Sequence, residues 1–253
     1  MTIDTERRAP IADVAVVIPA LNPGDALART VADVRRHLEG SGRTVEIVVV
    51  SDGSTDGSEA AVIGWVGVRV VSHHPRRGKG YALRRGLADT NAATVLFIDA
   101  DGDIDAGVLP RLCDALDADP AAWAAVADRF HDDSVTVEQW TRRVAHLGFA
   151  RLTSFAFGLQ VLDTQCGAKG FRRQSLHILL PQCGQDGFVF DVELLALGAS
   201  HGMGGVVPVA VHVERLGDST LTISAAARMG AQVVLLWWQL SVRRRRRPWA
   251  GRR

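Results

Sequence analysis

Short apolar runs rich in valine and isoleucine alternate with segments of helical periodicity over the first hundred residues. The runs have the length of strands buried on both faces of a parallel sheet, and they occupy residues 14–18, 47–50, 68–71 and 94–98. Helices are predicted between them, at 25–39, from Ser54 or Thr55 onward, and at 80–88. This order predicts an α/β fold with right-handed crossovers, a mostly parallel sheet and helices on both faces.

The second half of the chain is less regular. Helices are predicted at 135–157, 191–199 and 222–242, a loop at 158–170 and a strand at 206–213. We see neither an internal repeat nor a Pro- or Gly-rich linker in the sequence. We therefore expect one α/β domain over residues 1–216 and a C-terminal extension over residues 217–253.

Composition and cysteine content indicate a folded protein of a reducing compartment. The 253 residues are 47% hydrophobic and 23% charged, which argues against disorder. Three cysteines fit neither a disulfide framework nor a zinc site. The polar first ten residues do not resemble a signal peptide, and the apolar stretch 233–240 is far shorter than the ~20 residues that span a bilayer. We expect a cytoplasmic protein that does not cross the membrane by itself.

Charge is distributed unevenly along the chain. The formal net charge is +1, but residues 241–253 hold seven arginines and no acidic residue, so the rest of the chain is acidic. A basic tail that follows Trp237 and Trp238 predicts attraction to an anionic membrane surface. The alternative is a solvated tail behind a helix packed on the domain itself. Nucleic-acid binding is not expected, because the basic residues are confined to the tail and lack a basic-aromatic face.

Polar residues follow each of the four predicted strands. They form four clusters, at Pro19 to Asn22, Ser51 to Asp56, His73 to Gly80 and Asp99 to Asp103. In open α/β sheets ligands bind at the carboxyl ends of the strands. We therefore expect the four clusters to converge on one edge of the sheet.

Asp99, Asp101 and Asp103 stand at alternate positions directly after the fourth strand. Three carboxylates this close repel one another unless a cation neutralises them, and oxygen ligands with room for phosphate suit Mg²⁺ or Mn²⁺. An EF-hand is excluded, because Ile104 and Pro110 stand where its loop needs glycine and glutamate. A haloacid-dehalogenase phosphatase is also excluded, because it carries Asp-x-Asp-Gly on its first strand. A solvated acidic turn is the remaining alternative.

Two further clusters point to a nucleotide. Asp52 at the end of a strand can accept hydrogen bonds from a base or ribose, and the turn Arg77-Gly-Lys-Gly can offer backbone and positive charge to a diphosphate. The turn is not a Walker P-loop, because Ser or Thr is missing after Lys79. Without a G-x-G-x-x-G after the first strand, a dinucleotide oxidoreductase is not expected.

In this order the motifs resemble those of family-2 glycosyltransferases of the GT-A fold, which is Rossmann-like. The resemblance rests on Val17 to Asn22, Val50 to Gly57, Arg77 to Gly80 and Asp99 to Gly102. Two later segments resemble the dolichyl- or polyprenyl-phosphate glucosyltransferases: Asp-Thr-Gln-Cys-Gly-Ala-Lys at 163–169 and Phe-Asp-Val-Glu-Leu-Leu at 190–195. The resemblance implies a GT-A catalytic domain over 1–216, and a membrane-proximal helix with a basic tail over 217–253.

The resemblance also implies a role for each motif. The donor, expected to be UDP-glucose, would be bound by Pro19, Ala20, Asn22, Asp52, Arg77, Lys79, Asp99, Ala100 and Asp101. Mg²⁺ or Mn²⁺ would be held by Asp99, Asp101 and Asp103. The acceptor phosphate would be faced by Gln165, Lys169, Arg172 and Arg173, and Asp191 occupies the place of the general base in inverting relatives. Departures from the family pattern at Leu21, Pro23 and Ser51 leave the donor open, with GDP-mannose and a UDP-N-acetylhexosamine as alternatives.

These roles predict an inverting transfer of a hexose to a polyprenyl phosphate by an enzyme bound peripherally to the inner face of the membrane. A phosphate monoester with a second pKa near ~6 is largely anionic at neutral pH, so Asp191 would position the acceptor rather than deprotonate it. A hydroxyl acceptor would need Asp191 as a base. The alternatives are a soluble enzyme that glycosylates a small molecule or glycan, and a non-catalytic, membrane-recruited binding module.

Overall fold

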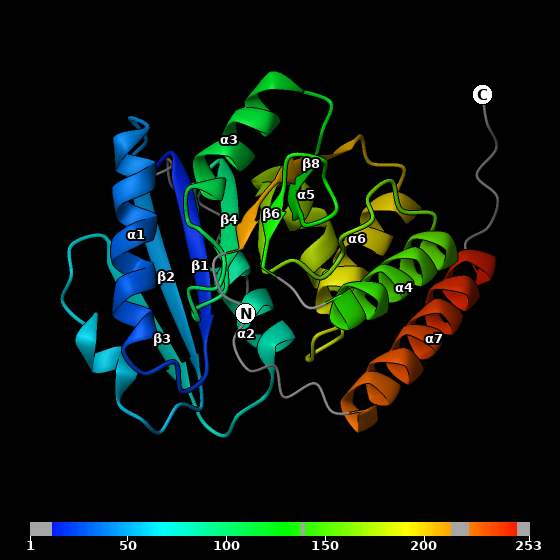
Figure 1. Ribbon diagram of the computed structural model, residues 1–253, viewed down its shortest axis with the longest axis horizontal. Coiled ribbons are helices and arrows are strands. Elements are labelled where there is room, and N and C mark those ends of the chain that lie inside the picture. The colour runs from blue at the N-terminus through cyan, green and yellow to red at the C-terminus, as the bar shows by residue number, and fades with distance from the viewer. Residues whose placement is uncertain (1–11, 138–139, 214–222, 247–253) are drawn as a thin grey trace, which may run out of the picture.

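The computed structural model describes residues 12–137, 140–213 and 223–246 (Figure 1). Its main sheet has seven strands in the order β3-β2-β1-β4-β7-β5-β8. The strands are β1 (Val14–Ala20), β2 (Val45–Asp52), β3 (Val68–His73), β4 (Thr94–Ile98), β5 (Ala124–Asp128), β7 (Ala168–Arg172) and β8 (Val206–Ala210). Every pairing is parallel except those of β7, which runs antiparallel between β4 and β5. The predicted mostly parallel α/β sheet is confirmed.

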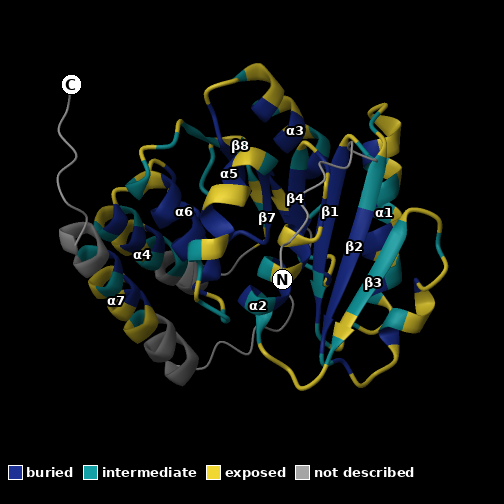
Figure 2. Cartoon of the chain, turned by 180° about the vertical axis from the view of Figure 1, so that it is seen from behind, coloured by how far each residue is buried: buried dark blue, intermediate teal, exposed yellow. Residues whose placement is uncertain are grey.

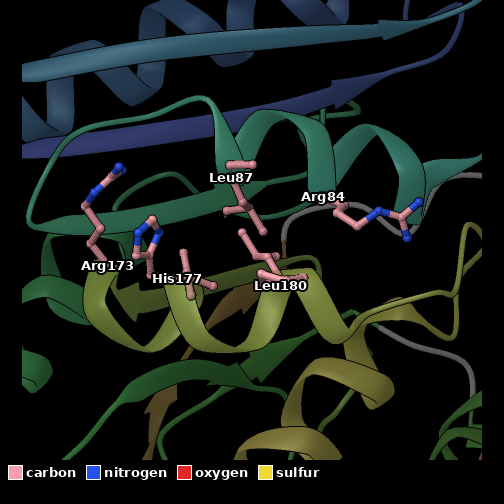
Figure 3. A pocket seen from close by; sticks show the side chains of 8 residues that line it. Arg84, Leu87, Arg173, His177 and Leu180 are labelled. Atoms are coloured by element: carbon pink, nitrogen blue, oxygen red, sulfur yellow. The ribbon is translucent and has the colours of Figure 1, made fainter. Parts of the chain in front are cut away.

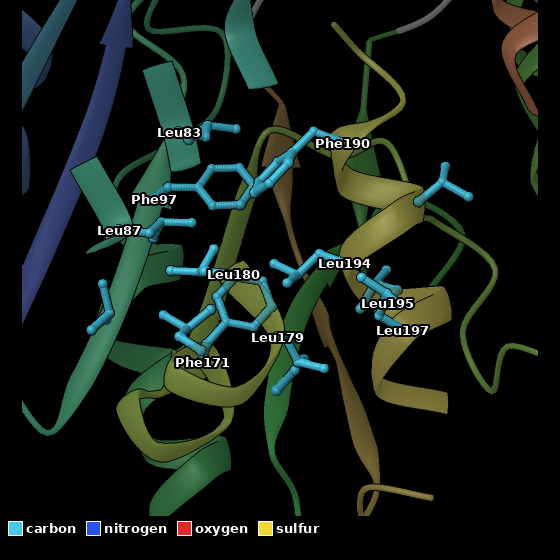
Figure 4. Packing of buried hydrophobic residues seen from close by; sticks show 14 of the residues in the cluster. Leu83, Leu87, Phe97, Phe171, Leu179, Leu180, Phe190, Leu194, Leu195 and Leu197 are labelled. Atoms are coloured by element: carbon cyan, nitrogen blue, oxygen red, sulfur yellow. The ribbon is translucent and has the colours of Figure 1, made fainter. Parts of the chain in front are cut away.

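Helices cover both faces of this sheet, because alternate residues of each strand point to opposite sides. In β1, Val14, Val16 and Ile18 join a core with α1 (Ala26–Gly40) and α3 (Val108–Ala118). The residues between them, such as Val17, join a second core with α2 (Lys79–Ala88), α5 (Arg173–Leu179) and α6 (Phe190–Ser200). Figure 2 shows the buried strands between these layers, and Figure 4 shows Phe97, Phe171 and Phe190 gathered in the second core.

The last helices lie beside the sheet rather than over its centre. The helices α4 (Trp140–Phe157) and α7 (Ile223–Arg246) pack against each other (Figure 1). Buried side chains of α7, Val233, Leu236 and Leu240, join the second core. The predicted boundary between residues 216 and 217 lies outside the described residues. Across the described ranges, none of the helices combines the length and the apolar character that a membrane span requires.

Several predicted elements are corrected. No α-helix begins at Ser54 or Thr55, because Gly53 and Gly57 adopt positive φ and a short 3₁₀ turn, η1 (Ser58–Ala61), follows. Residues 135–136 form the short strand β6 (Val135–Thr136), which pairs with β9 (His212–Val213), so the predicted helix begins later, with α4. The predicted loop at 158–170 ends in β7. The sequence did not predict α3, β5, α5 or the 3₁₀ turn η2 (Leu180–Gln182).

Candidate active site

The carboxyl ends of β1, β2, β3 and β4 meet at one edge of the sheet, as predicted. We call this edge the rim, and we call the edge at the amino ends of these strands the opposite edge. Because β7 is antiparallel to β4, with Ala168 paired to Ile98, the segment just before β7 also reaches the rim. Residues 165–167 therefore come to lie beside Asp99, which directly follows Ile98.

Asp99 is held at the rim from two sides. Its Oδ1 lies 2.5 Å from Nζ of Lys79, and its backbone N–H donates to the carbonyl of Gly167 at 3.0 Å. A Cβ on Gly167 would overlap with Oδ2 of Asp99, so this position admits no side chain unless Asp99 moves. Lys79 is the first residue of α2, so the ammonium and the amino end of that helix are presented at the same place.

Negative charge dominates the surroundings of Lys79. Burial by itself would lower the pKa of Lys79, but the carboxylates of Asp99, Asp191 and Asp101 outweigh burial and raise it. Burial raises the pKa of Asp101, and the charges of Asp99 and Asp103 raise it further. The rim therefore gathers several carboxylates around one ammonium, an arrangement that a divalent cation would relieve.

The acidic turn after β4 suits a metal held jointly with substrate. The backbone N–H of Asp103 donates to Oδ1 of Asp101 at 3.1 Å, which places these two carboxylates on one turn. Among the residues that the structure describes, no group of three or more His, Cys, Asp or Glu is arranged to hold a metal ion. Oδ1 of Asp99 forms the ion pair with Lys79, and the prediction that Asp99 joins Asp101 and Asp103 as a metal ligand stays a prediction. Mg²⁺ and Mn²⁺ fit Asp101 and Asp103, since Mg²⁺ typically binds one or two carboxylates together with water and substrate phosphates.

Asp52 fixes the basic turn beside Lys79. Its carboxyl is buried at the end of β2 and accepts hydrogen bonds from the backbone N–H groups of Arg77 and Gly78, at 2.7 and 2.8 Å. Nε2 of His73 lies 2.8 Å from the same carboxyl. Gly78 has a φ of 116°, and a Cβ on it would overlap with the backbone carbonyl of Asp186, so this turn requires glycine. Asp52 thus orders the turn that presents Lys79, and its contact with a base stays a prediction.

The turns after β1 and β2 are joined to each other. Oδ1 of Asn22 accepts from the backbone N–H of Thr55 at 2.8 Å, and the N–H of Asn22 donates to Oγ of Ser54 at 3.1 Å. Ala20 is buried and Pro19 is partly exposed at the end of β1. These residues lie at the predicted place on the rim, and their contacts with a donor stay predictions.

Lys169 and Asp191 form an ion pair beneath the rim. The side chain of Lys169 is 0% exposed and that of Asp191 is 4% exposed, and Nζ of Lys169 lies 3.4 Å from Oδ1 of Asp191. Nζ also donates to the carbonyl of Cys166 at 2.6 Å. The ammonium of Lys169 is thus directed at partners within the core, and the predicted contact of Lys169 with an acceptor phosphate stays a prediction. Gln165 is partly exposed and lies two residues before Gly167, whose carbonyl binds Asp99, and its contact with an acceptor stays a prediction.

Arg172 and Arg173 lie at the opposite edge. Arg172 pairs with Thr94 at the start of β4, whereas Ala168 pairs with Ile98 at its end. The guanidinium of Arg172 donates to the carbonyls of Leu116, Asp119 and Ala122. Arg173 donates to Oδ1 of Asn91. Because β7 leads away from the rim, both arginines lie far from the acidic turn along this strand, and their acceptor contacts stay untested predictions.

Arg129 and Asp163 form a second buried ion pair, which the sequence did not predict. Nε and an Nη of Arg129 donate to the two oxygens of Asp163 at 2.7 and 2.9 Å, and the backbone N–H of Arg129 donates to Oδ2 at 3.0 Å. Burial by itself raises the pKa of Asp163, but Arg129 outweighs burial and lowers it. The pair ties the end of β5 to the loop before β7. Asp163 opens the motif at 163–169, but Arg129 follows a strand that the sequence did not predict.

A cavity of about 330 Å³ lies between α2 and α5, away from the rim (Figure 3). Leu87, Leu176 and Leu180 give it an apolar lining, and Arg84 and Arg173 stand near it. Arg84 is bound to Asp186 and to carbonyl oxygens. Since the rim carboxylates do not line it, this cavity is not the candidate active site.

A doubly covered, mostly parallel sheet with an acidic turn after β4, beside a lysine at a helix start, defines a glycosyltransferase of the GT-A class. The sequence model of glycosyl transferase family 2 matches residues 15–179. The chain belongs to this family, and it is a glycosyltransferase.

Relatives and solved structures agree with this assignment. The dolichyl-phosphate beta-glucosyltransferase of Drosophila melanogaster is 28% identical over 255 residues, which cover 94% of this chain and 78% of the relative. The enzyme of the same name from Saccharomyces cerevisiae is 31% identical over 207 residues, 72% of this chain and 61% of the relative. In structure, the chain resembles the glucosyl-3-phosphoglycerate synthase of Mycobacterium tuberculosis in complex with Mn²⁺, UDP-glucose and glycerol 3-phosphate, with a TM-score of 0.69, 24% identity, and coverage of 90% and 80%. The structural likeness establishes the fold.

Proposed function

We propose that this glycosyltransferase moves glucose from UDP-glucose to a polyprenyl phosphate, with inversion at the anomeric carbon. The observation that carries the donor side is the rim itself, where Lys79 and an acidic turn face the same place. The acceptor side is supported by the names of the relatives, which act on dolichyl phosphate. Inversion requires a single in-line displacement, in which the acceptor oxygen attacks as the nucleoside diphosphate leaves.

The basic turn would stabilise the leaving diphosphate. The backbone of Arg77 and Gly78 is fixed by Asp52, and Lys79 is fixed by Asp99, so these donors need little reorganisation when charge develops on the diphosphate. The raised pKa of Lys79 keeps its ammonium charged across the neutral range. Its cation is thus available for the diphosphate at the pH of the cytosol.

A divalent metal would supply further charge neutralisation on the diphosphate, held by Asp101 and Asp103. The raised pKa of Asp101 reflects burial and neighbouring carboxylates that a cation would offset. The M. tuberculosis neighbour was crystallised with Mn²⁺ and UDP-glucose, which supports the same pairing of metal and donor here.

Asp191 would orient the acceptor phosphate rather than deprotonate it. A phosphate monoester is already largely ionised at neutral pH, with a second pKa near ~6, so the attacking oxygen carries its charge on arrival. Asp191 is connected to the donor side, because its charge acts on Lys79. A carboxylate and an ionised phosphate repel each other, so Asp191 would act through a hydrogen-bond donor between them, a hydroxyl or a water, and so keep the acceptor in the line of displacement.

We propose that residues 217–253 form a membrane-proximal extension, and that α7 within it contacts the membrane surface. One side of this helix is buried on the second core through Val233 and Leu236. The outer side is also apolar: Val234, Leu235, Trp237 and Trp238 are 64%, 50%, 48% and 59% exposed. Tryptophans suit the interface of a bilayer, and the arginine run that follows suits anionic lipid. We propose that the enzyme is peripheral on the inner face of the membrane.

Transfer assays test the reaction. Purified protein would be given UDP-glucose, GDP-mannose or UDP-N-acetylglucosamine with Mn²⁺ or Mg²⁺, with a short polyprenyl phosphate, with glycerol 3-phosphate, or without acceptor. We expect glucosyl lipid from UDP-glucose, loss of product with EDTA, and its return when Mn²⁺ is restored. Product on glycerol 3-phosphate alone would contradict the lipid acceptor and keep the donor. No turnover of any donor by folded protein would contradict the whole proposal.

Flotation with vesicles tests the membrane contact. We expect wild type to float with vesicles that contain phosphatidylglycerol, and to float less with phosphatidylcholine alone. Trp237→Ala with Trp238→Ala is expected to weaken flotation and to leave transfer to a detergent-dispersed acceptor unchanged. The matched control is Ile63→Ala with Val66→Ala, two exposed apolar residues near β3, which should float like wild type. Equal flotation of all three proteins would contradict a role of α7.

A further inference from the structure

We infer that Lys169 is a positioning residue for Asp191: it holds one carboxylate oxygen from within the core and leaves the other to accept a hydrogen bond from a hydroxyl or water next to the acceptor phosphate. The inference deepens the proposed function and rests on it. It assigns Lys169 to the support of the reaction, in place of direct acceptor contact.

The ammonium of Lys169 is buried and has two polar partners, the carboxylate of Asp191 and the carbonyl of Cys166. A wholly buried ammonium is costly unless it is paired and hydrogen-bonded. Lys169 meets both requirements, with Oδ1 of Asp191 at 3.4 Å and the carbonyl of Cys166 at 2.6 Å. The ring of Phe97 lies on another side, with its centroid 5.1 Å from Nζ. The position of the ammonium is therefore set by β4, β7 and α6 together.

Asp191 receives only part of what its carboxylate can accept. Lys169 contacts Oδ1, and no hydrogen bond from a described residue reaches Oδ2. The side chain is 4% exposed, so its access to solvent is narrow. A carboxylate that is anchored at one oxygen and open at the other is suited to orient a bound group.

The pair is also coupled to the donor side through short covalent and packing links. Cys166, whose carbonyl binds Lys169, precedes Gly167, whose carbonyl binds the backbone N–H of Asp99. On the other side, a Cβ on Gly80 would lie 2.7 Å from Cβ of Phe190, the residue before Asp191. Gly80 follows Lys79, which pairs with Asp99. A continuous series of contacts therefore connects the two ion pairs, Lys79 with Asp99 and Lys169 with Asp191. A shift of Asp191 would change its position relative to the donor.

The kinetic test uses Lys169→Met, Lys169→Arg, Asp191→Asn and the double variant Lys169→Met/Asp191→Asn. We expect Lys169→Met to lower kcat by about 10²-fold, because a misplacement of about 1 Å has that effect, and to leave KM for UDP-glucose within about twofold. Lys169→Arg should recover part of kcat, since it restores a cation. Residues that act as a unit are non-additive, so the double variant should be about as slow as Asp191→Asn alone.

Two results would overturn the inference. One is a double variant in which the two losses multiply, which would show that Lys169 and Asp191 act independently. The other is Lys169→Met with unchanged kcat and a raised KM for the acceptor, which would return Lys169 to acceptor binding. Arg43→Met is the control, because this arginine pairs with Asp114 and Asp117 at the opposite edge and should leave kcat and KM unchanged.

An unfolding experiment tests the ion pair without any substrate. Lys169→Met leaves a buried carboxylate without its partner, so the urea midpoint should fall, and Asp191→Asn in the same chain should recover part of the loss. A double variant with a lower midpoint than Lys169→Met would contradict the pair. If Lys169→Met does not fold, Lys169→Arg and the double variant give the same comparison. If the unfolding results are as expected but wild type makes no glucosyl lipid, then the proposed function is wrong and the ion pair is supported. The kinetic comparison would then measure the remaining turnover of the donor.

Discussion

The two edges of the sheet carry similar charged residues, but they use them differently. At the rim, the carboxylates of Asp99, Asp101 and Asp191 act on Lys79, and the pKa values of Asp101 and Lys79 are both raised. At the opposite edge, Arg172 donates to three backbone carbonyls. Arg43 there pairs with two aspartates, at 2.7 and 3.1 Å.

The charged groups at the opposite edge are paired within the protein and stabilise the fold. Those at the rim include several carboxylates that a bound ligand would neutralise. Charges that are matched inside the protein have little left to offer a substrate. Charges of one sign held together raise the free energy of the free enzyme locally, and binding of a cation or a charged substrate lowers it again. We therefore expect substitutions of these rim residues to lower activity, and substitutions of charged residues at the opposite edge to lower stability.

The largest effect is expected at the acidic turn. Asp101→Ala should lower kcat for transfer by about 10³-fold, because it removes a proposed ligand of the metal on the leaving diphosphate, and should leave the free energy of unfolding unchanged or raised. The measurement is initial rate at saturating Mn²⁺ together with a urea titration. Asp114→Ala is the matched control, since its carboxylate is 64% exposed and pairs with Arg43 at the opposite edge. Equal losses of rate in both variants would remove the contrast between the edges.

Gly167→Ala is expected to have the next largest effect. The added Cβ would overlap with the carboxylate of Asp99, so Asp99 and its partner Lys79 must shift, and kcat should fall by about 10²-fold. Steady-state rates with UDP-glucose measure the loss. Gly148→Ala in α4 meets no atom within 4 Å and should keep the wild-type rate. A wild-type rate in both variants would show that the place of Asp99 is not critical.

Arg172→Met should affect stability alone. The change removes the donor of three hydrogen bonds to carbonyls, so we expect the free energy of unfolding to fall by about 1–3 kcal/mol, with kcat and the acceptor KM unchanged. Urea unfolding and acceptor titrations measure the two quantities. A raised KM for polyprenyl phosphate would instead restore the role that the sequence motif implied.

The last prediction concerns the ion pair of Arg129 and Asp163 at the end of β5, and its effect on the free energy of unfolding appears at acid pH. The pKa of Asp163 is lowered in the folded protein from 3.8. Its contribution to stability is therefore complete above pH 3.8 and is lost as the pH falls through the lower folded value. Unfolding free energies measured between neutral and acid pH should show this loss in wild type, and Asp163→Asn should reduce it. An identical acid dependence in both proteins would contradict the pair's contribution.

The first half of the chain was predictable because its signals are local. The strands β1 to β4 are runs of β-branched residues, and each ends in a polar cluster that the parallel order brings to one edge. The turn after β2 was not predictable as such. Gly53 and Gly57 interrupt a segment whose composition allows a helix, and Ser54 bonds to Asn22 instead of capping one.

The strand β7 shows where local signals fail. Its sequence, Ala-Lys-Gly-Phe-Arg, contains no β-branched residue and begins beside a lysine that would normally be exposed. Its central position can accommodate Lys169 because Asp191 of α6, 22 residues later in the chain, pairs with the buried ammonium. Its direction then decides which residues reach the rim: Gly167 does, and Arg172 does not.

The sequence by itself determined the fold class, the family and the place of the acidic turn, because hydrophobic periodicity and closely spaced motifs act over a few residues. The tertiary structure alone decided the partners of the charged groups. It forms the ion pairs of Asp99 with Lys79, Asp191 with Lys169 and Asp163 with Arg129. Burial makes an unpaired charge costly, so each buried charge is matched to whichever partner the packing brings near it, at a separation along the chain that no local pattern records.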